Sequence, residues 1–138
     1  LSETSLESIL IQIADMKDER GLRVAAQGTQ LIIPTAYTFV AERLLESQLR
    51  TGTADNDINA IKSGGYLPKG YHVMRRLTDA DQFFVQTDVP DGLKYFTRSA
   101  MRKGMEGDFE TGNIRYKCRE RYSFGFTDWR GVFGSEGA

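Results

Sequence analysis

The chain has 138 residues, of which 40% are hydrophobic and 27% are charged, and its formal net charge is −1. This length provides one domain with a core of its own, and the net charge indicates neither a polyanionic nor a polycationic partner for the whole molecule. The single cysteine, Cys118, excludes an intrachain disulfide, and no apolar run is long enough to span a bilayer, so we expect a soluble intracellular product without a membrane partner.

The N-terminal segment predicts an amphipathic helix over residues 5–19. Thr4 and Glu7 have capping-box spacing, and Gly21 follows the charged turn as a stop signal. Apolar side chains share one face at 3.6 residues per turn: Leu6, Ile9, Leu10, Ile13 and Met16. Because the chain begins at Leu1 rather than methionine, with residues that already resemble a helix cap, we expect it to be part of a longer protein.

A short apolar run predicts a buried strand, and a second helix follows it. The run is TQLIIP, and Pro34 both ends the strand and begins a helix that extends to about Leu49. The apolar residues of this helix recur at helical spacing: Tyr37, Val40, Ala41, Leu44 and Leu45. Residues 50–70 have no sustained period and predict a long exposed loop, where contacts with a partner would lie.

The remaining segments predict strands. YHVMRRL and FFVQTD lie on either side of a turn, and LKYFTRSA adds a third strand. The last segment alternates most regularly and has an apolar face of Ile114, Tyr116, Cys118, Tyr122, Phe124 and Phe126. We expect this face in the core. The order of elements indicates the α+β class, with two amphipathic helices and a mainly antiparallel sheet.

One polar cluster has part of the spacing of a calcium loop. Asp55, Asp57 and Asn59 match the first three ligand positions, but Ala60 replaces the glycine of the sixth position and Tyr66 the glutamate of the twelfth. The pattern therefore does not predict a calcium site.

The residues also do not combine into a catalytic centre. His72 is the only histidine, so a two-histidine metal set cannot be built, and nothing in the sequence connects it with Cys118 as a nucleophile–base pair. We expect no catalytic residue, no cofactor and no metal, although an enzyme whose catalytic residues lie upstream remains an alternative.

The charges are unevenly distributed along the chain. Residues 1–92 contain 13 acidic and 9 basic side chains, whereas residues 93–130 contain 5 acidic and 9 basic ones. The alternative function is therefore a small α+β nucleic-acid-binding module that uses the basic C-terminal strand. Against it, the aromatic and basic residues of this strand fall on opposite faces, so aromatic side chains in the core could not stack on bases.

Five segments, in chain order, resemble the C-terminal part of tailed-phage major capsid proteins, which have the Hong Kong 97-type fold. They are SLESILIQIADMKDERG, LIIPTAYTFVAERLLES, TGTADNDIN, FFVQTD and RYSFGFTDWRGVFGSEG. Trp129, Arg130 and Gly131 match an aromatic, arginine and glycine group at the end of the family's final strand. The resemblance covers residues 2–134 and depends on the order and local character of the elements.

The resemblance implies a division of the chain. Residues 1–21 would be a spine-type helix, residues 22–112 an axial-type α+β domain with a long loop at 50–70, and residues 113–138 the long C-terminal strand of a peripheral-type domain. The family's N-terminal arm and extended hairpin loop would lie upstream of Leu1.

The resemblance also implies a function: a non-enzymatic structural subunit of a tailed-phage or prophage head, which self-assembles into pentamers and hexamers that enclose the DNA genome. The implied partners are other copies of the chain, possible scaffold and portal proteins, and packaged DNA held without sequence-specific binding. The implied location is the virion capsid, assembled in the host bacterial cytoplasm. The candidate subunit-contact residues are Asp55, Asn56, Asp57 and Asn59 in the loop, and Arg115, Lys117, Arg119 and Arg121 on the last strand.

Overall fold

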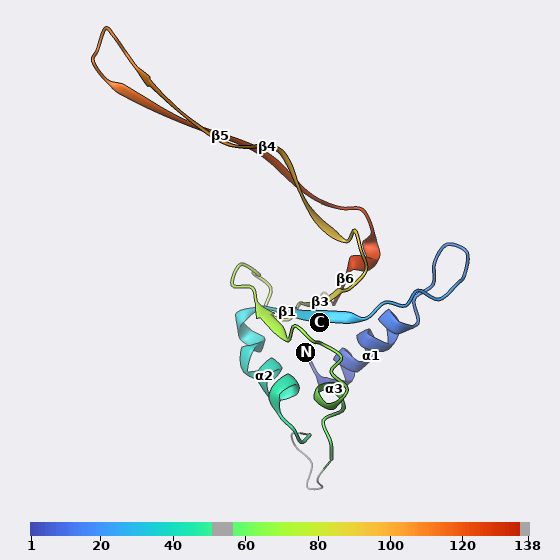
Figure 1. Ribbon diagram of the computed structural model, residues 1–138. Helices are drawn as coiled ribbons and strands as arrows, with labels where there is room; N and C mark the ends of the chain where they lie inside the picture. The colour runs from blue at the N-terminus through green and yellow to red at the C-terminus, as the bar shows by residue number, and fades with distance from the viewer. Residues whose placement is uncertain (51–56, 136–138) are drawn as a thin grey trace.

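The computed structural model of the chain describes residues 1–50 and 57–135. In this part the chain forms a body, in which helices cover one side of a four-stranded sheet, and a long two-stranded hairpin that projects from the body (Figure 1). Helices together with mainly antiparallel strands confirm the predicted α+β class.

Helix α1 (Glu3–Ala14) begins earlier and ends earlier than the sequence predicted. Its capping box joins Ser2 and Ser5: the Ser5 backbone N–H donates to Ser2 Oγ at 3.2 Å, and the Ser2 N–H donates to Ser5 Oγ at 2.9 Å. The predicted capping box of Thr4 and Glu7 is therefore wrong. After the helix, Asp18 Oδ1 accepts from two backbone N–H groups, at Arg20 and Leu22, and such local bonds compete with helical ones.

The sheet has the order β2-β1-β3-β6. Strand β1 (Gly28–Ile33) pairs in parallel with β2 (Tyr71–Val73) and antiparallel with β3 (Phe83–Thr87), and β3 pairs antiparallel with β6 (Val132–Ser135). The strands predicted in YHVMRRL and FFVQTD are present as β2, which is shorter than predicted, and β3, and β1 lies between them in the sheet. Leu31 and Ile33 of β1 have no exposed surface and belong to the core.

The crossover between the parallel strands β1 and β2 contains the helices η1 (Thr35–Tyr37), α2 (Thr38–Glu46) and α3 (Ala60–Ser63). Helix α2 is shorter than predicted, and α3 lies in a segment that was predicted to be a loop. The core combines buried side chains from the helices and the sheet: Leu6, Ile13, Leu31, Ile33, Ala41, Leu45, Ile61, Phe83 and Val85.

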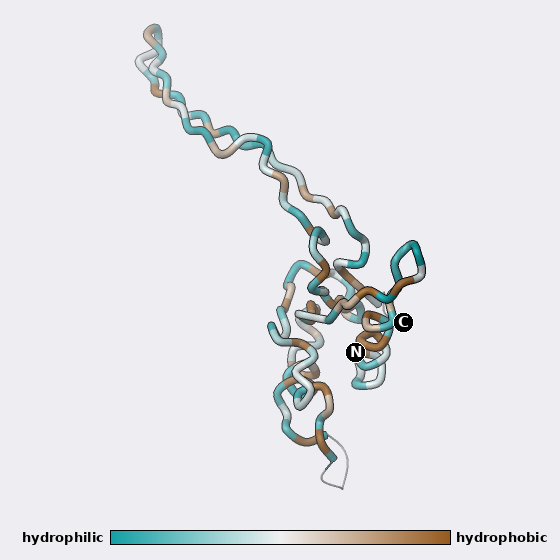
Figure 2. Tube along the Cα trace, turned by 45° about the vertical axis from the view of Figure 1, so that its right-hand side comes forward, coloured by the Kyte–Doolittle hydropathy of each residue, from teal (hydrophilic) through white to brown (hydrophobic). Residues whose placement is uncertain are grey.

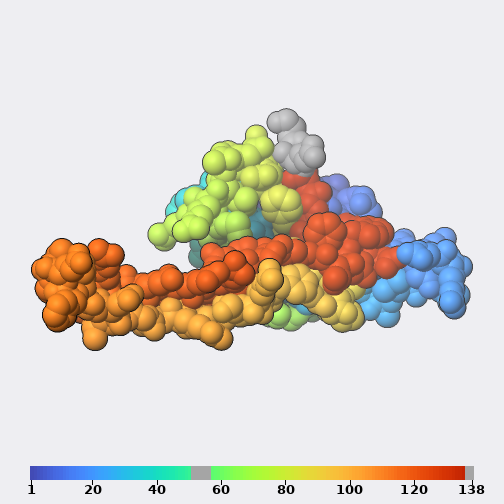
Figure 3. Space-filling model, turned by 90° about the horizontal axis from the view of Figure 1, so that it is seen from above, coloured from blue at the N-terminus to red at the C-terminus, as the bar shows by residue number. Residues whose placement is uncertain are grey.

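The hairpin consists of β4 (Leu93–Gly107) and β5 (Ile114–Phe126), with a register that runs from Leu93 opposite Phe126 to Gly107 opposite Ile114. The register shifts twice between Thr97 and Arg102. Figure 2 shows the two strands twisting about each other as they extend away from the body, and Figure 3 shows from above that they project beyond it.

The strand predicted at the C-terminal end is confirmed as β5, but its expected burial is wrong. Tyr116 is 78% exposed and Phe124 is 74% exposed, and Cys118 is also exposed. The alternation identified two faces correctly. It could not show what covers them, and no other described element packs over the outer hairpin.

Candidate functional site

The hairpin presents apolar side chains on one face, in a cluster near the body and another near the tip, with the Lys103–Cys118 pair and Glu120 between the two clusters. Residues directly opposite each other in an antiparallel pair project on the same side, and the register places apolar side chains of both strands together. Near the body these residues are Leu93, Tyr95, Tyr122, Phe124 and Phe126, and near the tip they are Met105, Ile114 and Tyr116. All of them are exposed. The hairpin therefore carries an apolar surface on both strands that nothing in the described chain covers.

Three rings of this face pack against one another. The ring centroids of Tyr95 and Phe124 are 5.3 Å apart, and those of Tyr122 lie 5.5 Å from each of them. The Tyr95 hydroxyl donates to Glu120 Oε1 at 3.2 Å. Desolvation and then the nearby Glu120 carboxylate raise the pKa of Tyr95. These contacts hold the rings in a defined arrangement before any partner arrives.

The opposite face is basic. Arg98, Arg102, Arg119 and Arg121 line a shallow groove of about 300 Å³ together with Ser99. The register places Arg102 directly opposite Arg119, and Ser99 opposite Arg121. The two register shifts between Thr97 and Arg102 occur beside this groove.

The four basic residues predicted from the sequence lie on β5, and the structure brings only two of them into the groove. Arg119 and Arg121 line it, whereas Arg115 pairs with Asp108 at 3.2 Å and Lys117 lies opposite Gly104. Arg98 and Arg102 were not predicted from the sequence. Both lie on β4. The pairing of Arg102 with Arg119 and the presence of Arg98 in the groove lining show that they share a face with Arg119 and Arg121.

The loop candidates have different environments. Asp55 and Asn56 lie outside the described residues. Asp57 is exposed, and its backbone carbonyl accepts from the Arg50 N–H at 2.9 Å.

Asn59, by contrast, is 5% exposed, and its amide is used inside the chain. Its Oδ1 caps α3 by accepting from Ile61 N and Lys62 N, and its Nδ2 donates to the carbonyls of Leu44 and Ser47. The Asn59 side chain thus joins the end of α2 to the start of α3.

The Trp129–Arg130–Gly131 group forms the base of the hairpin, as helix η2 (Trp129–Gly131). The Asp128 side chain caps this helix, and Thr87 Oγ1 donates to the Arg130 carbonyl at 2.7 Å. A Cβ atom added to Gly131 would lie 2.5 Å from the Gly92 Cα, so the two backbones touch. This contact fixes the start of β4 against the entry to β6.

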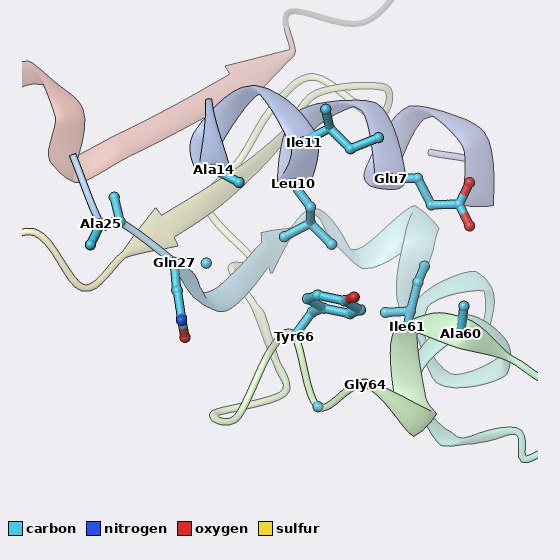
Figure 4. A pocket seen from close by; sticks show the side chains of 13 residues that line it. Glu7, Leu10, Ile11, Ala14, Ala25, Gln27, Ala60, Ile61, Gly64 and Tyr66 are labelled. Carbon is cyan, nitrogen blue, oxygen red and sulfur yellow. The ribbon is translucent and has the colours of Figure 1, made fainter. Parts of the chain in front are cut away.

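A second surface feature is an apolar groove of about 600 Å³ between α1, α3 and the segment before β1. Figure 4 shows Leu10 and Ile11 of α1 above Tyr66, with Glu7 toward one end. Among the described residues, no three histidine, cysteine, aspartate or glutamate side chains gather closely enough to hold a metal ion. The same part of the chain contains no helix with the length and apolarity needed to cross a membrane.

A family model described as phage capsid protein matches residues 2–135. The chain belongs to the phage capsid protein family. No curated protein and no solved structure matches it. The family is structural rather than enzymatic, and its members assemble with one another into the shell of the virion. The family match confirms the prediction of a phage capsid protein. The division of the chain into spine-type, axial-type and peripheral-type parts remains a prediction.

Proposed function

We propose that this capsid chain is a subunit of a tailed-phage head with the Hong Kong 97-type arrangement, in which pentamers and hexamers enclose the DNA genome. The β4–β5 hairpin is the arm by which one subunit contacts its neighbours. Assembly takes place in the host bacterial cytoplasm, with scaffold and portal proteins as further partners. The family match supports the shell, and the exposed hairpin supports its role as the contact arm.

The observation that carries the proposal is the uncovered apolar face of the hairpin. Soluble monomers rarely expose continuous apolar patches of more than a few hundred Å². A two-stranded ribbon is also marginal in water unless another strand or helix packs on it. Phe124, Phe126 and Tyr116 are each more than two-thirds exposed in the single chain. Burial against another subunit would remove these side chains from water and stabilise the ribbon.

Subunit contacts of this kind are weak singly and strong together. Each copy meets several neighbours in a closed shell, so a modest interface is repeated and the effective concentration of the next contact is high. In this proposal the loop residues Asp55, Asn56 and Asp57 contribute contacts near a symmetry axis. Lys117 and the groove arginines contribute contacts from the hairpin.

The test replaces two aromatic side chains of the apolar face, Phe124→Ser with Phe126→Ser, in protein made from the complete coding sequence. We expect shells in electron micrographs to be lost or reduced by about tenfold, because the contact surface loses its apolar centre. The matched control is Phe39→Ser on α2, since Phe39 is 75% exposed and Phe124 is 74% exposed. Wild-type shell yield from the hairpin variant would contradict the proposed role of the hairpin.

A further inference from the structure

We propose that the basic groove of the hairpin, formed by Arg98, Arg102, Arg119 and Arg121, binds carboxylates on the body of a second copy of the chain. This inference rests on the proposed function, because it names the partner chemistry of one face of the contact arm. It assigns a role to Arg98 and Arg102, which the sequence pattern alone did not connect with the other two arginines.

The groove collects positive charge that the chain does not neutralise. Arg102 lies directly opposite Arg119, and like charges in such a cross-strand pair are destabilising. Two basic residues of the hairpin outside the groove have partners, since Lys94 pairs with Asp91 and Arg115 pairs with Asp108. Within residues 1–50 and 57–135, none of the four groove arginines forms an ion pair. An anionic partner would relieve this repulsion.

The body of the same chain has the complementary charge. Residues 1–92 contain 13 acidic and 9 basic side chains, the reverse of the excess in residues 93–130, where 5 are acidic and 9 are basic. Glu19 and Glu42 are exposed on the body and take part in no ion pair within its described residues. A hairpin that lies on the body of the next copy would therefore bring opposite charges together. Such a contact joins two different surfaces, and contacts of this type form a ring when the rotation between copies closes.

Carboxylates fit the groove better than nucleic-acid phosphates because of what lies on the other face. Sites for single-stranded nucleic acid combine basic residues with aromatic rings on which bases stack. Here Tyr95, Tyr122 and Phe124 project on the side opposite the groove, so this cluster of rings cannot stack on bases whose phosphates contact the arginines. Phe96, opposite Ser123, lies on the groove side as a single ring. An exposed apolar face on the same ribbon also favours a protein partner.

The experiment measures self-association of the capsid chain by sedimentation velocity between about 50 and about 500 mM NaCl, a range over which screening becomes severe. We expect association of the wild-type chain to weaken at least tenfold across this range. The charge-reversal variant, Arg102→Glu with Arg119→Glu, is expected to associate about tenfold more weakly at low salt and to lose most of the salt dependence.

The matched control is Arg75→Glu with Arg76→Glu, which changes the net charge equally at two exposed arginines of the body. We expect it to associate like the wild type. Arg102→Gln with Arg119→Gln removes the charge without creating repulsion between carboxylates, so it keeps the test valid if charge reversal disturbs the hairpin. Far-ultraviolet circular dichroism verifies that each variant is folded.

Three results in solution would overturn the inference. One is equal association of the groove variants and the wild type at every salt concentration. A second is a wild-type chain that stays monomeric at low salt. The third is salt-dependent binding of a short DNA duplex that the groove variants lose while self-association is unchanged, which would assign the groove to phosphates.

Different outcomes would contradict this inference and the proposed function. Shells that form normally from the groove variants but not from the Phe124 and Phe126 variant would overturn only this inference. A wild-type protein that forms no shell would instead count against the proposed function.

Discussion

Replacing Asn59 with alanine tests how the body of the capsid chain holds its second helix. Asn59 Nδ2 lies 2.7 Å from the Leu44 carbonyl and 3.0 Å from the Ser47 carbonyl, and Oδ1 lies 3.1 Å from Ile61 N and 3.3 Å from Lys62 N. Alanine removes all four hydrogen bonds, at a residue that is only 5% exposed.

The expected loss follows from two contributions. Removing an N-cap side chain costs about 1 kcal/mol. The two carbonyls at the end of α2 also lose their donor, and each lost hydrogen bond costs about 1 kcal/mol. We therefore expect Asn59→Ala to lower the free energy of unfolding by about 3 kcal/mol, measured by urea denaturation and circular dichroism.

Two further variants separate these contributions. Serine at residue 59 keeps an N-cap acceptor but is too short to reach the carbonyls of α2, so Asn59→Ser should lose about 2 kcal/mol. Asp57→Ala, at an exposed neighbour, should change stability by less than about 0.5 kcal/mol. A wild-type unfolding midpoint for Asn59→Ala would refute the reasoning, and so would equal losses in the alanine and serine variants.

Two other predictions concern the hairpin base and η1. Gly131→Ala places a Cβ 2.5 Å from the Gly92 Cα, so it should lower the free energy of unfolding by about 2 kcal/mol and with it the thermal unfolding temperature. The control, Gly104→Ala, has no atom within 4 Å of the added Cβ and should change the unfolding temperature little. Equal decreases in the two variants would contradict the Gly92–Gly131 contact. Burial, followed by the hydrogen bond to the Asp81 carboxylate, raises the pKa of Tyr37 above its ordinary value of 10.0. The raised pKa stabilises the folded chain fully below the pKa of Tyr37 in the unfolded chain, and this stabilisation is lost as pH rises through the pKa of Tyr37 in the folded chain. Above about pH 10 the unfolding midpoint should therefore fall less in Tyr37→Phe than in the wild type. Parallel pH profiles of the two proteins would refute this prediction.

The sequence identified local patterns more reliably than pairings. The apolar period of α1 and the apolar run of β1 predicted the correct types of element, because each depends on neighbouring residues. The placement of β1 between β2 and β3 depends on contacts across more than 35 residues, which no local pattern contains. Asn59 shows the same limit, since its partners Leu44 and Ser47 lie 15 and 12 residues away.

For the hairpin, the alternation of β5 separated an apolar face from a basic one, and the structure retains both faces. An apolar strand face has the same period whether it packs in a core or in an interface between subunits, so its burial could not be inferred from periodicity. The groove needed the register with β4. Arg98 and Arg102 lie in a segment whose period is interrupted by the register shifts, so the sequence did not indicate which face they share.

The two faces of the hairpin restrict how neighbouring copies can use it. In a ribbon of two strands the apolar and basic side chains project in opposite directions, so one flat surface cannot contact both. A hairpin that buries its rings and also pairs its arginines must lie between two surfaces, either the walls of a groove on one copy or the bodies of two copies. The close Gly92–Gly131 backbone contact at the base of the hairpin fixes the direction in which the hairpin leaves the body. If both faces contact neighbouring copies, substitutions on either face should reduce assembly. Substitutions at the Gly92–Gly131 contact should change the orientation of the hairpin and so disturb the contacts of both faces.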